Sequence, residues 1–199
     1  MSDNIGLFDA DGSMADYEHQ LVKDMLVLQS PFDPSFDISQ LWGDSAPPYL
    51  KARERVVKRQ PRWWANLPPL QAGLFAYNLA EDIGFENRVL TQGPASNPAA
   101  WGEKVEWCQN WFGPEVSVTI TRNKDNAYGK FLYDDYPPYL LGWLKNRPRG
   151  LGIMPMNRHN VGFEHPQVFR WDGADRFRLE RVLRNCYERK SKEPLVIPE

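Results

Sequence analysis

Hydrophobic and polar positions follow one another along the chain in blocks that predict short strands separated by amphipathic helices. The first apolar run, residues 5–10, has the composition of a buried strand of a parallel sheet. In the next segment apolar side chains recur at helical spacing, until Pro31 and Pro34 end the helix. Further strands are predicted over residues 87–91, 116–121, 130–133 and 150–156, and further helices over residues 70–83, 98–112, 137–145 and 175–188. This alternation predicts an α/β fold, a Rossmann-like parallel sheet with helices on both faces.

Residues 31–68 interrupt the alternation. They are rich in proline, include the adjacent pair Trp63–Trp64, and contain a basic stretch, Lys51–Arg59, that is predicted to be helical. A segment this long with a helix of its own is more typical of an inserted lid than of an irregular loop. We therefore predict two parts. The small, mainly helical cap comprises residues 17–68, and the core domain comprises residues 1–16 and 69–199.

Composition and charge narrow the class of protein. The chain has 199 residues, enough for one full hydrophobic core with a small insertion. The formal net charge of −2 gives no basic field to attract nucleic acid, which favours a small ligand over a polymer. The two cysteines, Cys108 and Cys186, are too few for a zinc cluster and suit a reducing compartment as buried thiols. No segment resembles a signal peptide or a membrane span, so we expect a cytoplasmic protein without a membrane partner.

Polar side chains gather where the predicted strands end. They are, in chain order, Asp9, Asp11, Thr91, Asp134 and Asp135, with Lys104 on a helix that could point back to the same edge. Ligands of parallel sheets bind beyond the carboxyl ends of the strands. A convergence of acids, a hydroxyl and a lysine on that edge therefore predicts an active site.

Asp9 and Asp11 by themselves have two interpretations. Neighbouring carboxylates raise each other's pKa unless a cation such as Mg²⁺ neutralises them. One aspartate could then attack a phosphorus atom and carry the phosphoryl group covalently. A capping aspartate and an Asp–Gly turn would explain the same two residues without any chemistry. The polar residues at the other strand ends favour the first interpretation.

Asp9-x-Asp11, Thr91, Lys104 and Asp134-Asp135 together resemble the four motifs of the haloacid-dehalogenase-like phosphatases. Longer stretches are similar to the 5'(3')-deoxyribonucleotidase family. These stretches are Asp9-Ala-Asp-Gly-Ser-Met-Ala-Asp-Tyr17, Pro61-Arg-Trp-Trp-Ala-Asn-Leu-Pro-Pro69, Gly102-Glu-Lys104 and Leu132-Tyr-Asp-Asp135. The similarity covers about residues 5–145 and is specific as a set.

The resemblance implies a nucleotide phosphatase that uses Mg²⁺ and an aspartyl-phosphate intermediate. It makes Asp9 the nucleophile and Asp11 the general acid and then the general base. It also implies that Asp9, Asp134 and the backbone carbonyl of Asp11 ligate the metal, with Asp135 orienting the metal or its waters. The phosphate would be bound by Thr91, Gln92 and Lys104.

Aromatic residues in the cap suggest a nucleoside as the leaving group. By the same resemblance, Tyr17, Trp63 and Trp64 would form a base-binding pocket, in which each stacked aromatic face contributes about 1–3 kcal/mol. Trp64 is the better candidate, because two consecutive side chains cannot easily face the same way. The alternative is that the two tryptophans only anchor the cap against the core.

Two departures from the family pattern keep other functions open. Gln92 stands where the family has a small hydroxyl residue, and Tyr136 follows the paired aspartates where a basic or small residue is usual. The alternatives are a phosphatase of another small phosphate ester and a catalytically weak nucleotide-binding regulatory protein. The expected partner is a nucleoside monophosphate and not a nucleic-acid polymer, and a homodimer is left open.

Two polar segments have no assigned role. The loop Asn157–Asn160 follows a predicted strand and either borders the active-site edge or is an ordinary surface loop. The basic residues of the cap, from Lys51 to Arg62, either attract an anionic nucleotide or form a solvated helix face.

Overall fold

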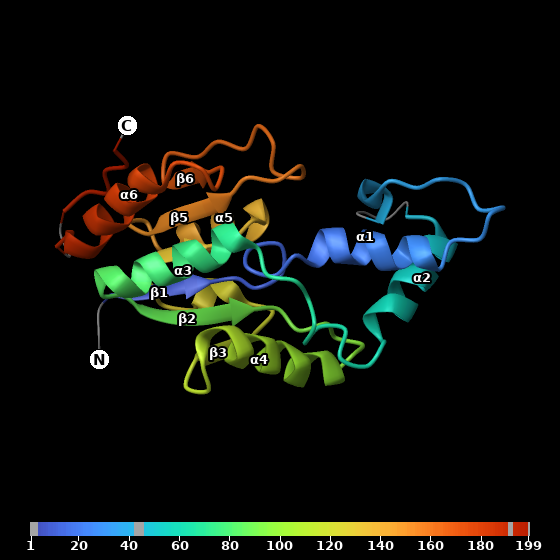
Figure 1. The fold of residues 1–199 in the computed structure, drawn as a ribbon. Helices are drawn as coiled ribbons and strands as arrows, with labels where there is room; N and C mark the ends of the chain where they lie inside the picture. Colours follow the sequence, from blue (N-terminus) through green and yellow to red (C-terminus); the bar gives the residue numbers. More distant parts are fainter. Residues whose placement is uncertain (1–3, 42–45, 191–192, 199) are drawn as a thin grey trace.

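The computed structural model has at its centre a six-stranded, wholly parallel β-sheet in the order β3-β2-β1-β4-β5-β6. It describes residues 4–41, 46–190 and 193–198. Strands β1 and β4 occupy the two central positions, and helices cover the sheet (Figure 1). The predicted α/β fold is confirmed. None of the helices in the described ranges is both long and apolar enough to cross a membrane.

All predicted strands and helices occur within a few residues of their expected bounds. The strands are β1 (Ile5–Phe8), β2 (Glu86–Thr91), β3 (Ser117–Ile120), β4 (Phe131–Tyr133), β5 (Leu151–Pro155) and β6 (Val168–Trp171). The helices are α1 (Tyr17–Val27), α2 (Pro48–Lys58), α3 (Gln71–Ile83), α4 (Ala99–Phe112), α5 (Pro137–Lys145) and α6 (Arg176–Glu188), with short 3-10 helices η1 (Ile38–Leu41) and η2 (Lys124–Asn126). Strand β6 was not predicted; it is a short edge strand that pairs only with β5.

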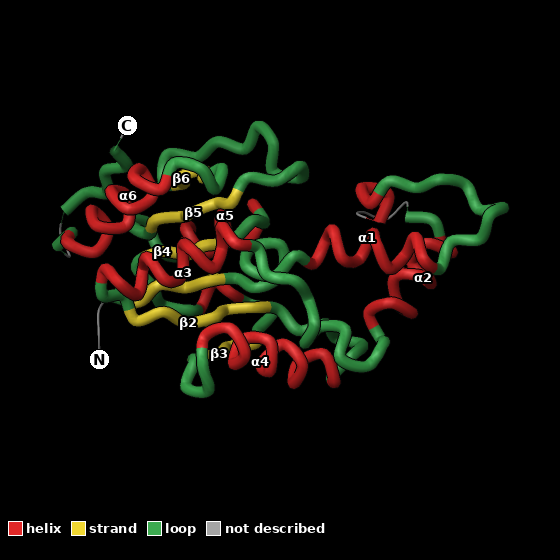
Figure 2. The backbone as a smooth tube through the Cα atoms, in the orientation of Figure 1, coloured by secondary structure: helices red, strands yellow, loops and turns green. Residues whose placement is uncertain are grey.

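Alternate residues of the central strands pack against different layers. Phe8 and Tyr133 belong to a buried cluster that includes apolar side chains of α3 and α6. Leu7 and Leu132 belong to a second cluster, which includes Trp143 of α5. Figure 2 shows the resulting sandwich of helices around the strands. Because both faces of the sheet are buried, only its edges and the strand ends are open to ligands.

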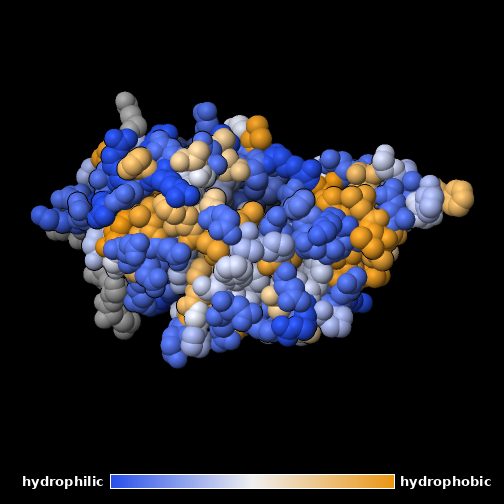
Figure 3. All heavy atoms as spheres, viewed as in Figure 1, coloured by the Kyte–Doolittle hydropathy of each residue, from blue (hydrophilic) through white to orange (hydrophobic). Residues whose placement is uncertain are grey.

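Helices α1 and α2 lie apart from the sheet, beyond the carboxyl ends of its strands (Figure 1). The two connections to the core run side by side: the amide of Asp16 donates to Pro68 O (2.7 Å), and the amide of Leu70 donates to Met14 O (2.7 Å). Figure 3 shows apolar residues on the surface of this part of the chain. Among the exposed apolar side chains of α1, α2 and the segment between them are Leu26, Val27, Phe32 and Val56.

Both cysteines are buried, and neither forms a disulfide. Burial raises the pKa of Cys108 to about 12 and that of Cys186 to about 11. Because the thiolate is the reactive form, we expect a thiol reagent at neutral pH to leave both residues unmodified in the native protein and to modify both after unfolding. Rapid labelling of the folded protein would contradict the packing of α4 and α6 around these thiols.

Candidate active site

The central strands bring three carboxylates together at their carboxyl ends. Strands β1 and β4 pair in register, with Phe8 opposite Tyr133, so the residues that follow them are neighbours. The amide of Asp9 donates to Tyr133 O (2.8 Å), which continues the pairing beyond the strand. Carboxylate oxygens of Asp9, Asp134 and Asp135, all buried, lie within 4.8 Å of one another. These three residues therefore lie together at one edge of the sheet, as the sequence predicted.

Lys124 lies between two of these carboxylates and was not identified from the sequence. Its Nζ is 2.6 Å from Oδ1 of Asp9 and 2.6 Å from Oδ2 of Asp134, and only 1% of its side chain is exposed. The same ammonium group lies 4.6 Å from the ring centroid of Tyr139 in α5. Lys124 begins η2, in the connection between β3 and β4. The sequence offers only a weak signal for it, namely that residues following β3 start at the carboxyl edge of the sheet.

Lys104, which α4 supplies, points to the site as predicted. Its ammonium group donates to a carboxylate oxygen of Asp11, to Oγ1 of Thr91 (3.2 Å) and to the backbone carbonyl of Gln92 (2.8 Å). The side chain of Gln92 instead accepts a hydrogen bond from the hydroxyl of Tyr139. The predicted phosphate-binding residues are thus grouped around one buried lysine. Gln92 contacts this lysine through its backbone carbonyl, while its side chain contacts Tyr139.

Asp135 is held by hydrogen bonds from several elements. Its Oδ1 accepts from Ser13 Oγ (3.2 Å), and its Oδ2 accepts from Asn157 Nδ2 (2.9 Å). Nε2 of His159 lies 2.9 Å from the same Oδ2, and Asn160 Nδ2 donates to the backbone carbonyl of Asp135 (3.0 Å). The loop Asn157–Asn160 therefore does border the carboxylate cluster. With both oxygens engaged, Asp135 is suited to orient a neighbouring group.

The turn after Asp11 approaches Asp135 so closely that it requires glycine. Gly12 has a φ of +75°, and a Cβ at this position would lie 2.5 Å from Oδ2 of Asp135. A side chain would be strained by the left-handed backbone and would also displace the carboxylate. The Asp–Gly pair in the sequence is therefore a turn and part of the site at the same time.

Burial dominates the electrostatics of the cluster. It raises the pKa of Asp9 well above its ordinary value of 3.8; Lys124 opposes this rise, while Asp134, Asp11 and Asp135 add to it. Burial likewise raises the pKa of Asp134, again opposed by Lys124. For Lys124, burial alone lowers the pKa, but attraction to Asp134 and Asp9 outweighs it and raises the pKa. Lys124 therefore only partly compensates the negative charge of these carboxylates.

The donor set fits a hard divalent cation. The clustered carboxylates of Asp9, Asp134 and Asp135 bring three negative charges, and Lys124, which contacts two of them, brings one positive charge. An excess of two negative charges remains, which one divalent ion would neutralise. Oxygen-only ligands that include one or two carboxylates are those that Mg²⁺ prefers.

The three predicted base-binding aromatics contact one another next to this cluster. Tyr17 stacks on Trp64, with ring centroids 5.6 Å apart and an interplanar angle of 19°. The two indoles are nearly perpendicular, at 89°, as expected of consecutive residues. Nε1 of Trp63 donates to Asp24 Oδ2 (2.8 Å) in α1, whereas the ring of Trp64 has Nζ of Lys104 at 4.7 Å from its centroid. Of the two tryptophans, Trp64 is the one that reaches the charged cluster.

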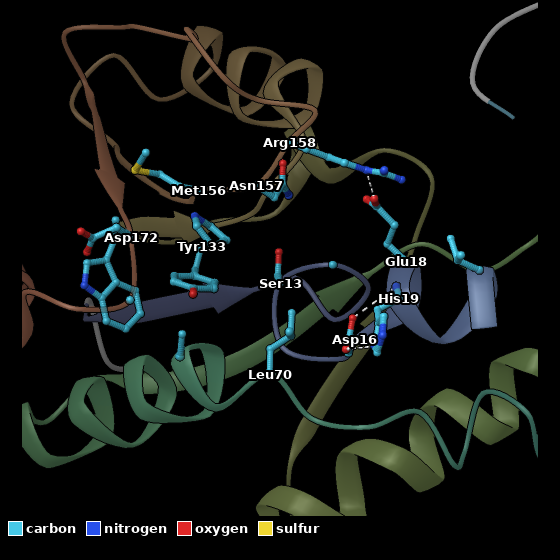
Figure 4. Close-up of a pocket in the computed structure, with 16 residues that line it drawn as sticks. Ser13, Asp16, Glu18, His19, Leu70, Tyr133, Met156, Asn157, Arg158 and Asp172 are labelled. Atoms are coloured by element: carbon cyan, nitrogen blue, oxygen red, sulfur yellow. Dashed lines mark hydrogen bonds and ion pairs between the residues drawn. The ribbon is translucent and has the colours of Figure 1, made fainter. Parts of the chain in front are cut away.

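Cavities of different size border the candidate site. One of about 10 Å³ is lined by Asp11, Trp64 and Lys104, and it has room for a water molecule at most. Another, of about 520 Å³, lies at the base of the cap and is lined by Ser13, Leu70 and neighbouring residues (Figure 4). Ionic contacts connect the cap to the core beside this larger cavity. Arg158, in the loop after β5, pairs with Glu18 of α1 and lies 3.5 Å from Asp37.

Comparisons with known proteins agree with the predicted resemblance. No protein-family model matches the chain. A protein of Bordetella bronchiseptica named "Putative 5'(3')-deoxyribonucleotidase" is 26% identical over 140 residues, which are 66% of this chain and 73% of that protein. A Bordetella pertussis protein of the same name is 25% identical over the same shares of the two chains.

A solved structure shows the same fold. It is the crystal structure of "a putative haloacid dehalogenase-like hydrolase" from Burkholderia xenovorans, with a TM-score of 0.59 and 16% identity over 92% of this chain and 96% of that one. Together these findings agree with the resemblance to haloacid-dehalogenase-like nucleotidases that the motifs indicated.

Proposed function

We propose that the protein is a Mg²⁺-dependent phosphatase that hydrolyses nucleoside monophosphates, preferably deoxyribonucleotides, to nucleoside and inorganic phosphate. The observation that carries the proposal is the buried cluster in which Lys124 contacts Asp9 and Asp134 while Lys104 contacts Asp11. The name that the two Bordetella relatives carry supports a nucleotide as the substrate.

In this proposal Asp9 is the nucleophile. Lys124 holds its Oδ1, which leaves Oδ2 to attack phosphorus as the bond to the leaving nucleoside oxygen breaks. Asp11 gives its proton to that oxygen, and it then takes a proton from the water that hydrolyses the phosphoaspartate. Inorganic phosphate leaves, and the Asp9 carboxylate is regenerated. Lys104 and Thr91 bind the phosphate oxygens and fix the direction of attack.

The metal would be held by the carboxylates of Asp9 and Asp134 and by the backbone carbonyl of Asp11. When bound, Mg²⁺ supplies positive charge that offsets repulsion between the carboxylates and an incoming phosphate. Asp135 keeps its place through Ser13 and Asn157 and would orient a water ligand.

We expect Mg²⁺ to raise the melting temperature of the protein, because it neutralises buried like charges and binds only the folded state. Asp134→Asn should remove most of this rise, whereas Asp82→Asn, at an exposed position of α3, should keep it. Differential scanning fluorimetry with Mg²⁺ and with EDTA measures both. An equal rise in wild type and Asp134→Asn would contradict the assigned ligand.

Substrate binding in this proposal requires the cap to move. The cavity of about 10 Å³ between Asp11, Trp64 and Lys104 is far smaller than a nucleoside. Opening at the paired connections near Asp16 and Leu70 would admit the substrate, and closing would exclude water from the phosphoenzyme. Tyr17 and Trp64 would then contact the base.

A substrate panel tests the proposal against its alternatives. Phosphate release from nucleoside monophosphates and from sugar phosphates is measured with Mg²⁺ and again with EDTA. We expect nucleotides to be the better substrates by kcat/KM and EDTA to abolish turnover. Equal turnover of sugar phosphates would contradict the nucleotide assignment, and tight nucleotide binding without phosphate release would indicate a regulatory binding protein.

A further inference from the structure

The basic stretch of α2 lines a cavity at the boundary between cap and core that the proposed function does not use. The cavity has a volume of about 250 Å³. One wall is the basic face of α2, and the other is the segment after β2, with Pro94, Ser96 and Asn97. Asn97 Nδ2 donates to the backbone carbonyl of Lys58 (2.9 Å) and so joins the two walls. The site has room for a phosphate group.

The cavity wall is strongly cationic. Three basic residues of α2 line it, Lys51, Arg55 and Lys58, together with Arg59 at the C-cap of the helix. Glu54 is the single acid among the described residues of the lining, and it pairs with Lys58 (2.8 Å). Arg55 and Arg59 lie four residues apart at the carboxyl-terminal end of α2, so their side chains are neighbours on one face of the helix.

Other basic residues of the cap are used within the protein. Arg53 is buried and pairs with Asp33, and Arg62 pairs with Glu106 of α4 (2.6 Å). Arg55 and Arg59 differ from them, because both are exposed and neither forms an ion pair with a carboxylate in the part of the chain that the structure describes. Their charge is available to a ligand.

The cavity adjoins the proposed reaction centre through Trp64. This indole lines both the cationic cavity and the small cavity with Asp11 and Lys104. Nζ of Lys104 lies 4.7 Å and Nζ of Lys58 5.7 Å from the ring centroid, so the two ammonium groups are at most about 10 Å apart. One nucleoside that carries two phosphates can reach both cations.

We propose that the cavity binds a second phosphate of the substrate, so that the preferred substrate is a nucleoside bisphosphate. This inference rests on the proposed function. One phosphate is cleaved at Asp9, while Arg55 and Arg59 hold the other. A dianionic phosphate matches guanidinium donors, which bind it through paired hydrogen bonds. The net charge of −2 favours this small ligand over a polynucleotide end.

The test compares kcat/KM for a deoxynucleoside 3',5'-bisphosphate with kcat/KM for the 5'-monophosphate, in the presence of Mg²⁺. We expect a ratio of about tenfold or more in wild type and a ratio near one in Arg55→Gln/Arg59→Gln, since two charged hydrogen-bond donors are lost. The matched control, Lys23→Gln/Lys145→Gln, removes the same charge from exposed positions elsewhere and should keep the wild-type ratio. The melting temperature should change little in Arg55→Gln/Arg59→Gln, because both side chains are exposed.

Failure of the inference and failure of the proposed function give different results. If wild type hydrolyses the monophosphate but has nearly the same kcat/KM for the bisphosphate, the second phosphate site is overturned and the proposed function stands. A high ratio that survives Arg55→Gln/Arg59→Gln would also overturn the second phosphate site. A higher kcat/KM for a 5'-phosphorylated oligonucleotide than for the bisphosphate would overturn the assignment to a small ligand. Absence of monophosphate and bisphosphate turnover would overturn the proposed function and the inference together.

Discussion

Replacing Asp9 with asparagine is expected to lower kcat by about four orders of magnitude or more, as loss of a covalent nucleophile does in other enzymes. The amide has the shape of the carboxylate, and its oxygen can still accept the hydrogen bond of Lys124, but it cannot carry a phosphoryl group. Phosphate release from the preferred nucleotide, with Mg²⁺ present, measures the effect.

The fold of Asp9→Asn should be intact. Burial and three neighbouring carboxylates raise the pKa of Asp9, so its charge is costly in the native state and its removal should not lower the melting temperature. Asp82→Asn, which neutralises an exposed aspartate of α3, is the control and should retain wild-type kcat. Substantial activity of a correctly folded Asp9→Asn would disprove the nucleophile assignment.

Replacing Lys124 with methionine is expected to lower both stability and activity. Removal of one partner from a buried ionic group costs about 3–5 kcal/mol of unfolding free energy, because the remaining charges lose their compensation. Here two buried carboxylates, Asp9 and Asp134, lose the ammonium group that lies 2.6 Å from each. Urea unfolding in EDTA measures the loss. Lys145→Met, at an exposed position of α5, should change the stability by less than about 0.5 kcal/mol.

The loss of unfolding free energy in Lys124→Met should depend on pH. Aspartates with a raised native pKa bind protons more tightly in the native than in the unfolded state, so stability falls as the pH rises from the ordinary value of 3.8 through the raised values. Lys124 opposes the rise in pKa of both aspartates, so its removal should raise their native pKa values further. The destabilisation should therefore be smallest in acid and grow toward neutral pH.

A second substitution separates the loss of charge compensation from simple loss of packing. Lys124→Met/Asp134→Asn should be more stable than the sum of the two single effects predicts, by about 1 kcal/mol or more, because one uncompensated carboxylate has been removed. Activity should not return. Additive effects would show that Lys124 stabilises the fold by packing alone.

The site residues that could be predicted from the sequence are mostly those that directly follow a strand. Asp9 and Asp134 could be placed together from the sequence because each directly follows an apolar run, and parallel strands end at one edge. Lys104 could be predicted because α4 runs back from the end of β2. The fold class follows from the same alternation of strands and helices.

Lys124 could not be predicted because its position depends on tertiary packing. It lies in a polar run, Arg122–Asn126, without periodicity, and nothing local distinguishes it from its solvated neighbours. It turns inward where η2 packs near Tyr139 of α5. The loop Asn157–Asn160 was left with two interpretations for a similar reason, since its contact with Asp135 follows from the pairing of β5 with β4. Strand β6 is defined by its pairing with β5 rather than by its own four residues.

Trapping the phosphoenzyme tests the central claim most directly. Wild-type protein with Mg²⁺ and a nucleoside monophosphate labelled at the phosphate is quenched in acid during turnover, and the label bound to protein is counted. We predict acid-stable label on the peptide that contains Asp9 in wild type and none in Asp9→Asn. Rapid phosphate release by wild type with no label on the protein at any quench time would contradict a covalent intermediate on Asp9.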